Sequence, residues 1–207
     1  MLTQLSVRDY AARLASADPT PGGGSAAALL GALAAALGEM VGNFTRDKEG
    51  WEEVEPALAE LTTRREALLD LTDRDAEAYA KVGAAYKLPK SNDDERSLRA
   101  AAIQDALKAS AQVPLAAIRE LSAAVKLLPV LLESGNRNLV SDVGVAADFA
   151  QSALRCAWLN VEINLSGVKD EEYKTAVRQS MEEMISEAEN IAADVWDQTV
   201  ELVTGEE

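Results

Sequence analysis

The sequence predicts an all-α protein, an antiparallel up-and-down bundle of long helices. Aromatic residues make up 4% of the chain, and runs of alternating β-branched residues are few, so strands are hard to place. Apolar residues instead recur at spacings of three and four, as in amphipathic helices. With 207 residues, 48% of them hydrophobic, the chain can bury a sizeable core, and a single domain over residues 1–207 is expected.

The first half of the chain predicts three helices. A short one covers residues 3–16, an alanine-rich one covers 25–43, and a long amphipathic one covers 52–86. The first two are separated by the glycine-rich stretch 18–24, whose glycines and prolines interrupt helices. Small residues at spacings of four, three and four on the second helix would let another backbone approach closely: Gly31, Ala35, Gly38 and Gly42.

The second half predicts three more helices. "KLPKSNDDER" is a polar break in which Asn92 or Asp93 can cap a helix that runs to about residue 126. Pro114 falls inside that helix and is expected to kink or interrupt it. Pro129 and "ESGNRN" mark the next break. The last two helices are expected at 141–166 and 170–203.

Charge and composition exclude several classes of function. The net charge of −15 argues against binding to nucleic acid or to an anionic membrane surface. The chain contains no histidine, so a Ser-His-Asp or Cys-His nucleophile and any His-ligated metal site are excluded. Acid–base chemistry would have to use carboxylates, lysine, tyrosine or the single cysteine, Cys156.

Location follows from the same composition. One cysteine rules out an intrachain disulfide and fits a reducing cytoplasm. The N-terminal residues carry charges and no long apolar stretch, so no signal peptide or membrane anchor is expected. The uncharged stretch 19–38 is long enough to raise the question of a membrane span, but its weakly apolar alanines and glycines favour a buried helix.

Three consecutive glycines stand directly before the alanine-rich helix. Gly22, Gly23 and Gly24 precede Ser25, where a helix N-terminus exposes N–H groups and positive dipole. Such a turn can receive an anion or let a flat ligand lie against bare backbone. It lacks the Gly-Lys-Ser/Thr ending of a nucleotide-binding loop. The alternative is a loop and helix cap with no ligand.

One carboxylate lies on an apolar stripe of the 52–86 helix. At about 100° per residue, Asp75 shares its stripe with apolar and aromatic residues, whereas Asp73 is expected to point to solvent. A carboxylate in such a stripe must be paired, hydrogen-bonded or raised in pKa, as is common at active sites. The alternative is a structural pair with an arginine or a tyrosine hydroxyl. The stripe contains Leu61, Leu68, Leu71, Tyr79, Val82 and Tyr86.

A second set of polar residues lies on the 141–166 helix. Asp142 and Asn160 are five helical turns apart and share a face with Asn164 and with small or apolar residues, as in a pocket wall. The alternative makes Ser141 or Asp142 a helix cap and the asparagines satisfied amides in the core.

Several ordered segments together resemble the cyclodeaminase/cyclohydrolase family of folate enzymes. They are "DPTPGGGSAAALLGALAAALGEMV", "DRDAEAY", "YKLPKSNDDE", "VPLA" and "GNRNLVSDVGVAADF…LNVEINL", between about residues 16 and 173. The resemblance implies a helical subunit that associates at least as a dimer. It also implies action on the one-carbon unit that bridges N5 and N10 of tetrahydrofolate, without a metal or prosthetic group.

The resemblance also implies which positions form the site. The matching positions are Gly22, Gly23, Gly24 and Ser25 in the glycine turn, Asp75, Lys87 to Lys90, then Asn136, Asn138, Ser141 and Asp142, and finally Asn160 and Asn164.

Chemistry suggests roles for these positions. The methenyl carbon is already electrophilic, so a buried carboxylate, Asp75 or Asp142, can stabilise the cation and take a proton from attacking water. Ser25 and the amides of the glycine turn would hold oxygens of the pterin or the intermediate, and the two late asparagines would orient the ring. Local positive charge would attract the glutamate tail, unless these side chains form only a solvated loop: Lys87, Lys90 and Arg137.

The resemblance leaves three functions open. The first is hydrolysis of 5,10-methenyltetrahydrofolate to 10-formyltetrahydrofolate, which the absence of a transferase domain slightly favours. The second is cyclodeamination of formiminotetrahydrofolate with loss of ammonia, for which a separately encoded glutamate formimidoyltransferase would supply substrate. The third is a non-catalytic folate-binding protein. All three place the chain in the cytoplasm, most simply as a homodimer.

Overall fold

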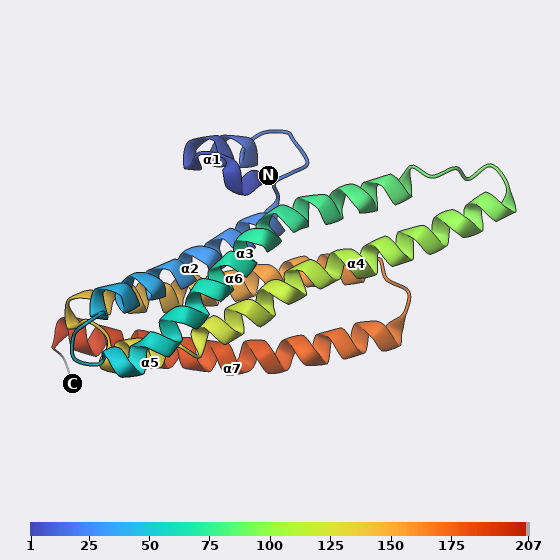
Figure 1. Ribbon diagram of the computed structural model, residues 1–207. Coiled ribbons are helices and arrows are strands. Elements are labelled where there is room, and N and C mark those ends of the chain that lie inside the picture. Colours follow the sequence, from blue (N-terminus) through green and yellow to red (C-terminus); the bar gives the residue numbers. More distant parts are fainter. Residues whose placement is uncertain (206–207) are drawn as a thin grey trace.

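The computed structural model describes residues 1–205, and this range is helical with no strand, so the predicted all-α class is confirmed (Figure 1). The last two residues of the predicted domain lie outside the described range. The elements are η1 (Leu2–Gln4), α1 (Val7–Leu14), α2 (Gly23–Thr45), α3 (Trp51–Tyr86), α4 (Asp93–Val125), α5 (Leu128–Ser134), η2 (Arg137–Leu139), α6 (Val140–Ser166) and α7 (Glu171–Thr204).

The predicted helices are found within a few residues of their expected ends, but the predicted break at Pro129 holds a further helix, α5, with this proline in its first turn, where a missing N–H is tolerated. Asn92 caps α4 as predicted, because its side chain accepts a hydrogen bond from the Glu95 amide at 2.9 Å. Pro114 was expected to kink or interrupt this helix, and it does not interrupt it, since α4 continues from Asp93 to Val125. Pro114 and Ser110, one turn before it, are both buried, and packing on both sides holds the helix together despite the lost hydrogen bond.

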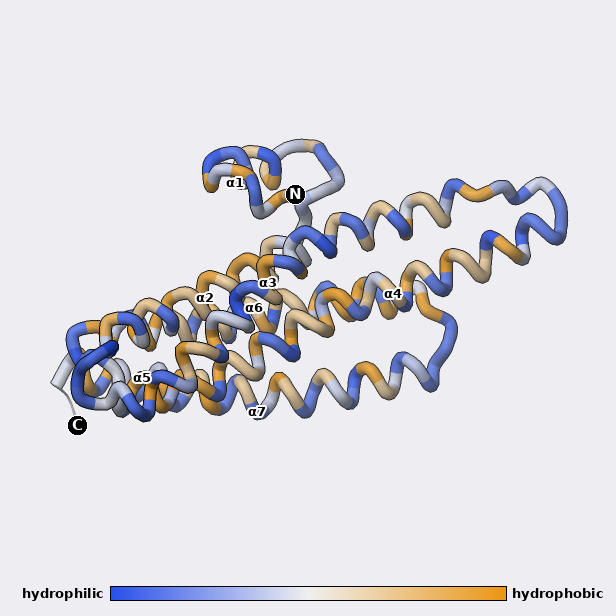
Figure 2. The backbone as a smooth tube through the Cα atoms, viewed as in Figure 1, coloured by the Kyte–Doolittle hydropathy of each residue, from blue (hydrophilic) through white to orange (hydrophobic). Residues whose placement is uncertain are grey.

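The long helices form a layered core. α2 lies between α3 and α6, α4 packs against both α3 and α6, and α7 covers the other side of α6. Figure 2 shows apolar segments along all of these helices where they meet. The largest fully buried side chains come from four of them: Leu61, Leu68, Ile118, Leu121, Leu154 and Met181.

The small residues of α2 make room for leucines rather than for another backbone. A Cβ on Gly31 would lie 2.6 Å from Leu121 Cδ2, and one on Gly38 would lie 2.9 Å from Leu61 Cδ1. The space beside these glycines was expected to hold the backbone of another helix. It is filled instead by leucine side chains of α4 and α3. By length and composition α2 could cross a membrane, but 56% of its most apolar window is buried among the other helices, as in the core helix of a bundle.

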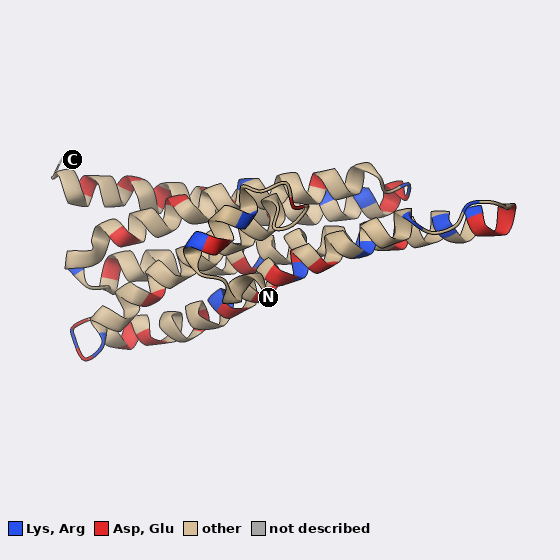
Figure 3. Ribbon diagram, turned by 90° about the horizontal axis from the view of Figure 1, so that it is seen from above, with Lys and Arg blue, Asp and Glu red and all other residues tan. Residues whose placement is uncertain are grey.

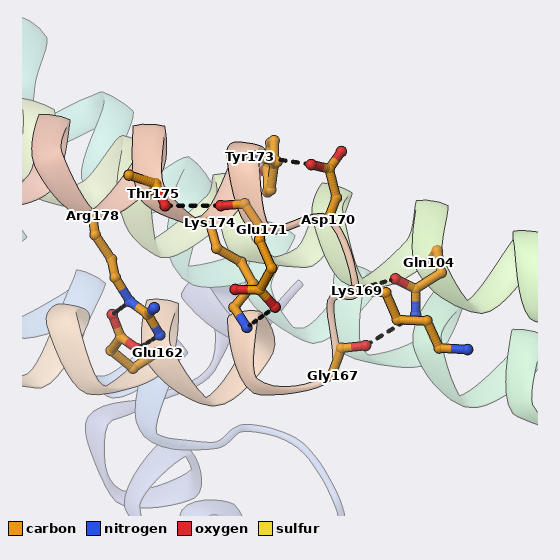
Figure 4. A network of polar contacts seen from close by, with 10 residues as sticks. All are labelled: Gln104, Glu162, Gly167, Lys169, Asp170, Glu171, Tyr173, Lys174, Thr175 and Arg178. Atoms are coloured by element: carbon orange, nitrogen blue, oxygen red, sulfur yellow. Dashed lines mark hydrogen bonds and ion pairs between the residues drawn. The ribbon is translucent and has the colours of Figure 1, made fainter.

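Polar contacts fix the turn between α6 and α7 (Figure 4). The Gln104 side chain, from α4, donates to the Gly167 carbonyl at 2.9 Å and accepts from the Lys169 amide at 2.7 Å. Glu162 and Arg178 pair through two hydrogen bonds of 2.7 and 2.8 Å between α6 and α7. These contacts set where α6 ends, and therefore where its late asparagines lie.

Two parts of the chain extend from the helical core (Figure 1). The end of α3 and the beginning of α4 project together as an arm, residues 78–99. Its residues 78–92 contain three lysines and no acidic residue, although the chain as a whole is acidic (Figure 3). The N-terminal segment, residues 1–21, places α1 apart from the long helices, and Leu2 is its buried anchor.

Candidate functional site

The glycine turn and Asp75 meet at the beginning of α2. Asp75 Oδ2, on α3, accepts hydrogen bonds from the Ser25 amide at 2.9 Å and the Ser25 hydroxyl at 3.1 Å. Gly22, the N-cap residue of α2, has no side chain to satisfy the N–H groups of the first turn. The carboxylate of a neighbouring helix therefore caps α2, and the positive end of the helix dipole faces it.

Gly24 is needed for this contact. An added Cβ would lie 2.1 Å from Asp75 Oδ1 and 2.6 Å from Asp75 Cγ, well inside van der Waals contact. At Gly22 a Cβ would meet nothing within 4 Å, and at Gly23 it would make ordinary contacts with Asn160. The three glycines therefore differ. Gly24, the last of them, is the position where a carboxylate lies directly against backbone that has no side chain.

Ser25 connects Asp75 to the backbone of α3. The buried Ser25 hydroxyl also lies 2.9 Å from the Thr72 carbonyl oxygen. A hydroxyl has one proton, so it donates to ionised Asp75 or to Thr72. When Asp75 is protonated, its carboxyl group can donate to Ser25 Oγ while Ser25 donates to Thr72. The arrangement therefore satisfies hydrogen bonding in both protonation states of Asp75.

The environment of Asp75 favours a carboxyl group that takes up a proton readily. Burial raises the pKa of Asp75, and the two hydrogen bonds from Ser25 oppose this effect in part. A partly buried carboxylate with a raised pKa and a proton-relaying neighbour is suited to general acid–base chemistry.

Asp73 does not point to solvent, and that prediction is wrong. It is buried, and its carboxylate accepts hydrogen bonds from the Leu2 amide, the Thr3 amide at 3.4 Å and the Thr3 hydroxyl at 2.6 Å. The helical wheel of α3 places Asp73 outside the main core correctly, but the N-terminal segment folds back and covers it. Asp73 is therefore the anchor of that segment.

The end of α6 lies against the glycine turn. An added Cβ on Gly23 would be 3.5 Å from Asn160 Nδ2, so Asn160 borders the Asp75 cluster. The Asn160 side chain donates to the Cys156 carbonyl, and the Asn164 side chain donates to the Asn160 carbonyl, both at 2.8 Å. These bonds leave the side-chain oxygens of both asparagines available as acceptors.

The other predicted residues of α6 and the segment before it lie at the opposite end of α2. Asn136 accepts from the Asn138 amide at 3.1 Å and donates to the Phe44 carbonyl at 3.1 Å, in the last turn of α2. Asp142 lies 18 residues before Asn160 on one continuous helix, which separates them by about 27 Å. Within one chain, Asp142 and Ser141 are therefore far from Asp75.

The basic residues of the arm are also remote from the carboxylate. Lys87 follows Asp75 by 12 residues along α3, a rise of about 18 Å, and Lys90 lies beyond the end of the helix. Both side chains are exposed.

Two hollows on the surface of residues 1–205 lie away from the Asp75 cluster. Two surface hollows of about 540 and 530 Å³ both include Arg137, at the far end of α2, and neither is lined by Asp75 or Asn160. In the described part of the chain no group of three or more Cys, Asp or Glu side chains is placed to hold a metal ion. A substrate bound at Asp75 would need further walls.

Comparison with known proteins identifies the family. A sequence model described as formiminotransferase-cyclodeaminase matches residues 6–183. This chain belongs to that family. A methenyltetrahydrofolate cyclohydrolase of Methylorubrum extorquens is 42% identical over 179 residues, which cover 84% of this chain and 86% of that protein.

Two further relatives show how the family domain is used. The formimidoyltransferase-cyclodeaminase of Rattus norvegicus is 33% identical over 93% of this chain, but the match covers only 36% of the rat protein. The crystal structure of a formiminotetrahydrofolate cyclodeaminase from Thermotoga maritima superposes with a TM-score of 0.80 at 35% identity, covering 99% of this chain and 98% of that one. The family resemblance and the fold are thus confirmed over nearly the whole chain.

Sequence reasoning missed one residue beside Asp75. Tyr10, on α1, has its hydroxyl buried close enough to Asp75 and Asp73 for their charges to raise its pKa, after burial itself. No spacing rule links position 10 to position 75, and the only available signal was the apolar face of a short helix near the N-terminus.

Proposed function

We propose that this chain hydrolyses 5,10-methenyltetrahydrofolate to 10-formyltetrahydrofolate. The observation that carries the proposal is the contact of Asp75 with Gly24 and Ser25, which holds a partly buried carboxylate of raised pKa against bare backbone. The cyclohydrolase relative, of similar length, supports this reaction.

Cyclodeamination of formiminotetrahydrofolate is the second candidate. The Thermotoga maritima protein named for that activity matches this chain over 98% of its own length. Length therefore does not distinguish the two reactions, contrary to the expectation from sequence. A separately encoded glutamate formimidoyltransferase would supply the formimino substrate. A non-catalytic folate-binding protein is the third possibility.

Asp75 can carry two of the three proton transfers of the hydrolysis. It takes a proton from water as the water oxygen bonds to the methenyl carbon, which gives a neutral carbinolamine. Protonated Asp75 then gives that proton to N5 while the bond between carbon and N5 breaks and its electron pair stays on N5. As this bond breaks, the hydroxyl proton is lost to solvent, which leaves the formyl group on N10. Ser25 follows each change in charge by turning between Asp75 and Thr72.

The remaining predicted residues can join this site only from a second copy of the chain. Asp142 is about 27 Å from Asn160 within one chain, so the two ends of α6 meet only if two α6 helices pair in opposite directions. We therefore place Asp142, Ser141, Asn136 and Asn138 of a partner subunit at the open side of the Asp75 cluster.

The exposed side of α6 suits such pairing. Val145, Leu159 and Ile163 are 39%, 60% and 68% exposed, and Ser152 and Cys156 lie between them on the same stripe. The neighbouring stripe of α2 is apolar and uncharged through Leu33, which is 48% exposed. On a chain of net charge −15, an uncharged face is where a second copy can approach without repulsion.

Two exposed apolar residues of α6 are placed symmetrically about Ser152. Val145 and Leu159 are each seven residues from it, so a two-fold axis there would place them against each other. The same axis places Asp142 of one copy opposite position 162 of the other, within about one turn of both Asn160 and Asn164. A homodimer of this geometry would bring both predicted carboxylates to one substrate.

The proposal also includes the direction of the helices, the role of the lysines on the arm, the absence of a cofactor and the location in the cell. The helices alternate in direction, which is supported by the proximity of Gly23 to Asn160 and of Phe44 to Asn136 at opposite ends of α2. Lys87 and Lys90 extend from the site along the arm and attract the glutamate tail of folate. The reaction needs no prosthetic group or metal, and a cytoplasmic location fits the reduced cysteine.

Two measurements on the purified protein distinguish the candidates. Loss of methenyltetrahydrofolate absorbance is followed at a pH where spontaneous hydrolysis is slow, and ammonia release is measured from formiminotetrahydrofolate. Enzyme-dependent loss of absorbance supports the hydrolase, and ammonia release supports the cyclodeaminase. Folate binding without either signal would leave a binding protein and contradict the proposal.

A further inference from the structure

The N-terminal segment carries one polar group for which the folded chain provides no bond. The Tyr10 hydroxyl is shut off from solvent and has no hydrogen-bond partner among residues 1–205. Every residue of α1 is otherwise exposed or only partly covered. A buried hydroxyl without a partner is unfavourable, and in folded proteins such groups often serve a function.

The segment is fixed so that Tyr10 lies beside the Asp75 cluster. Leu2 is buried, and Asp73 accepts hydrogen bonds from the Leu2 amide and from the Thr3 amide and hydroxyl. Asp73 precedes Asp75 by two residues on α3. A long-range contact of three hydrogen bonds therefore holds residues 1–10 over this part of α3.

The protonation state of Tyr10 suits a donor. Burial raises the pKa of Tyr10, and the charges of Asp75 and Asp73 raise it further. Its hydroxyl consequently keeps its proton across the neutral pH range. It also lies near a carboxylate without bonding to it, so its proton is not already committed to Asp75.

We infer that Tyr10 is a catalytic residue whose hydroxyl donates a hydrogen bond to the oxygen that adds to the one-carbon unit of the substrate. This inference rests on the proposed folate activity. As the carbinolamine loses its hydroxyl proton and expels N5, negative charge develops on that oxygen, and a fixed donor stabilises it without giving up its own proton. The N-terminal segment thus contributes a donor to the site beside Asp75.

The test compares Tyr10→Phe with Tyr173→Phe, the same substitution at a hydroxyl that is bonded. Tyr173, on α7, accepts from Gln112 at 2.6 Å and donates to the Lys108 carbonyl at 3.2 Å, both on α4. For Tyr10→Phe we expect kcat for methenyltetrahydrofolate hydrolysis to fall about 100-fold, as when a single oxyanion donor is removed, with KM nearly unchanged. Its Tm should equal or exceed that of the unmodified protein, because an unsatisfied buried hydroxyl is removed.

Tyr173→Phe should show the opposite pattern, with a lower Tm and unchanged kcat. Turnover by Tyr10→Phe at the rate of the unmodified protein would overturn the inference and leave the proposed function standing. A lower Tm together with a small loss of kcat would assign Tyr10 a structural role only, and would also overturn it. If the unmodified protein turned over neither folate substrate, the proposed function itself would fail, and the inference with it.

Discussion

Replacing Gly24 with alanine tests whether the bare backbone at the glycine turn exists for Asp75. The new Cβ would lie 2.1 Å from Asp75 Oδ1, and the carboxylate is held on its other side by Ser25. The side chain must move, and it then loses its hydrogen bonds to the Ser25 amide and hydroxyl. Each bond to a charged group contributes about 1.5–3 kcal/mol, and the better helix propensity of alanine returns about 1 kcal/mol.

The expected net loss is therefore about 2–5 kcal/mol in the free energy of unfolding. For a chain of this length that corresponds to a decrease in Tm of roughly 4–20 °C. The change can be followed by thermal or urea unfolding monitored by circular dichroism, with turnover of methenyltetrahydrofolate measured on the same samples. Turnover should fall with the displacement of Asp75.

Two matched glycines serve as controls. Gly83, inside α3, has nothing within 4 Å of an added Cβ, so Gly83→Ala should raise stability by up to about 1 kcal/mol. Gly23→Ala makes only ordinary contacts and should change stability little. In an Asp75→Ala background, Gly24→Ala should cost much less than alone, since the clashing group is gone. If Gly24→Ala were as stable as Gly23→Ala, the steric argument for this turn would be refuted.

Three further predictions follow from the same contacts. Burial raises the pKa of Asp75 in the folded protein above its ordinary value of 3.8, so protonation of Asp75 stabilises the folded state. This stabilisation is lost as the pH rises from 3.8 through the pKa of the folded protein. Asp75→Asn should therefore flatten the dependence of Tm on pH in that window and abolish turnover, and an unchanged pH dependence would contradict the assigned shift. Asp73→Ala should release the N-terminal segment, seen as faster proteolysis near residue 10 with α3 still protected, and should lower kcat as Tyr10→Phe does. Lys87→Glu combined with Lys90→Glu should raise KM for polyglutamylated substrate several-fold more than for the monoglutamate, with kcat preserved; equal effects on both would assign these lysines to a solvated loop.

The helices were predictable because their ends depend on local chemistry. Asn92 caps α4 through its own side chain, and Gly22 is the N-cap at which α2 begins. The failures arise where distant segments meet. Pro114 is tolerated because neighbouring helices bury it, and Asp73 is covered by residues more than 70 positions away. Neither effect leaves a trace in local periodicity.

The candidate site was predictable in its parts but not in its assembly. The helical wheel identified Asp75 as a carboxylate on an apolar stripe, and the glycine run marked an exposed helix N-terminus. Their contact, with Asp75 capping α2 at Ser25, depends on how α3 packs on α2. The wheel also placed Asp142 and Asn160 on one face of α6, which is correct as geometry. A shared face is not a shared site, because five turns separate the two residues.

The separation of Asp142 from Asp75 leads to a test that needs no further structure. If each site uses Asp75 of one subunit and Asp142 of the other, Asp75→Asn and Asp142→Asn are each inactive alone, but they complement each other when mixed. A mixed dimer contains one doubly substituted site and one intact site. Random reassortment makes half of the dimers mixed, so about a quarter of the activity of the unmodified protein should return. Chains unfolded together in urea and refolded should show this recovery, whereas chains refolded separately and then assayed at once should not. No recovery from two correctly folded variants would show that Asp142 does not act with Asp75 across subunits, and the site would then consist of the cluster at the glycine turn alone.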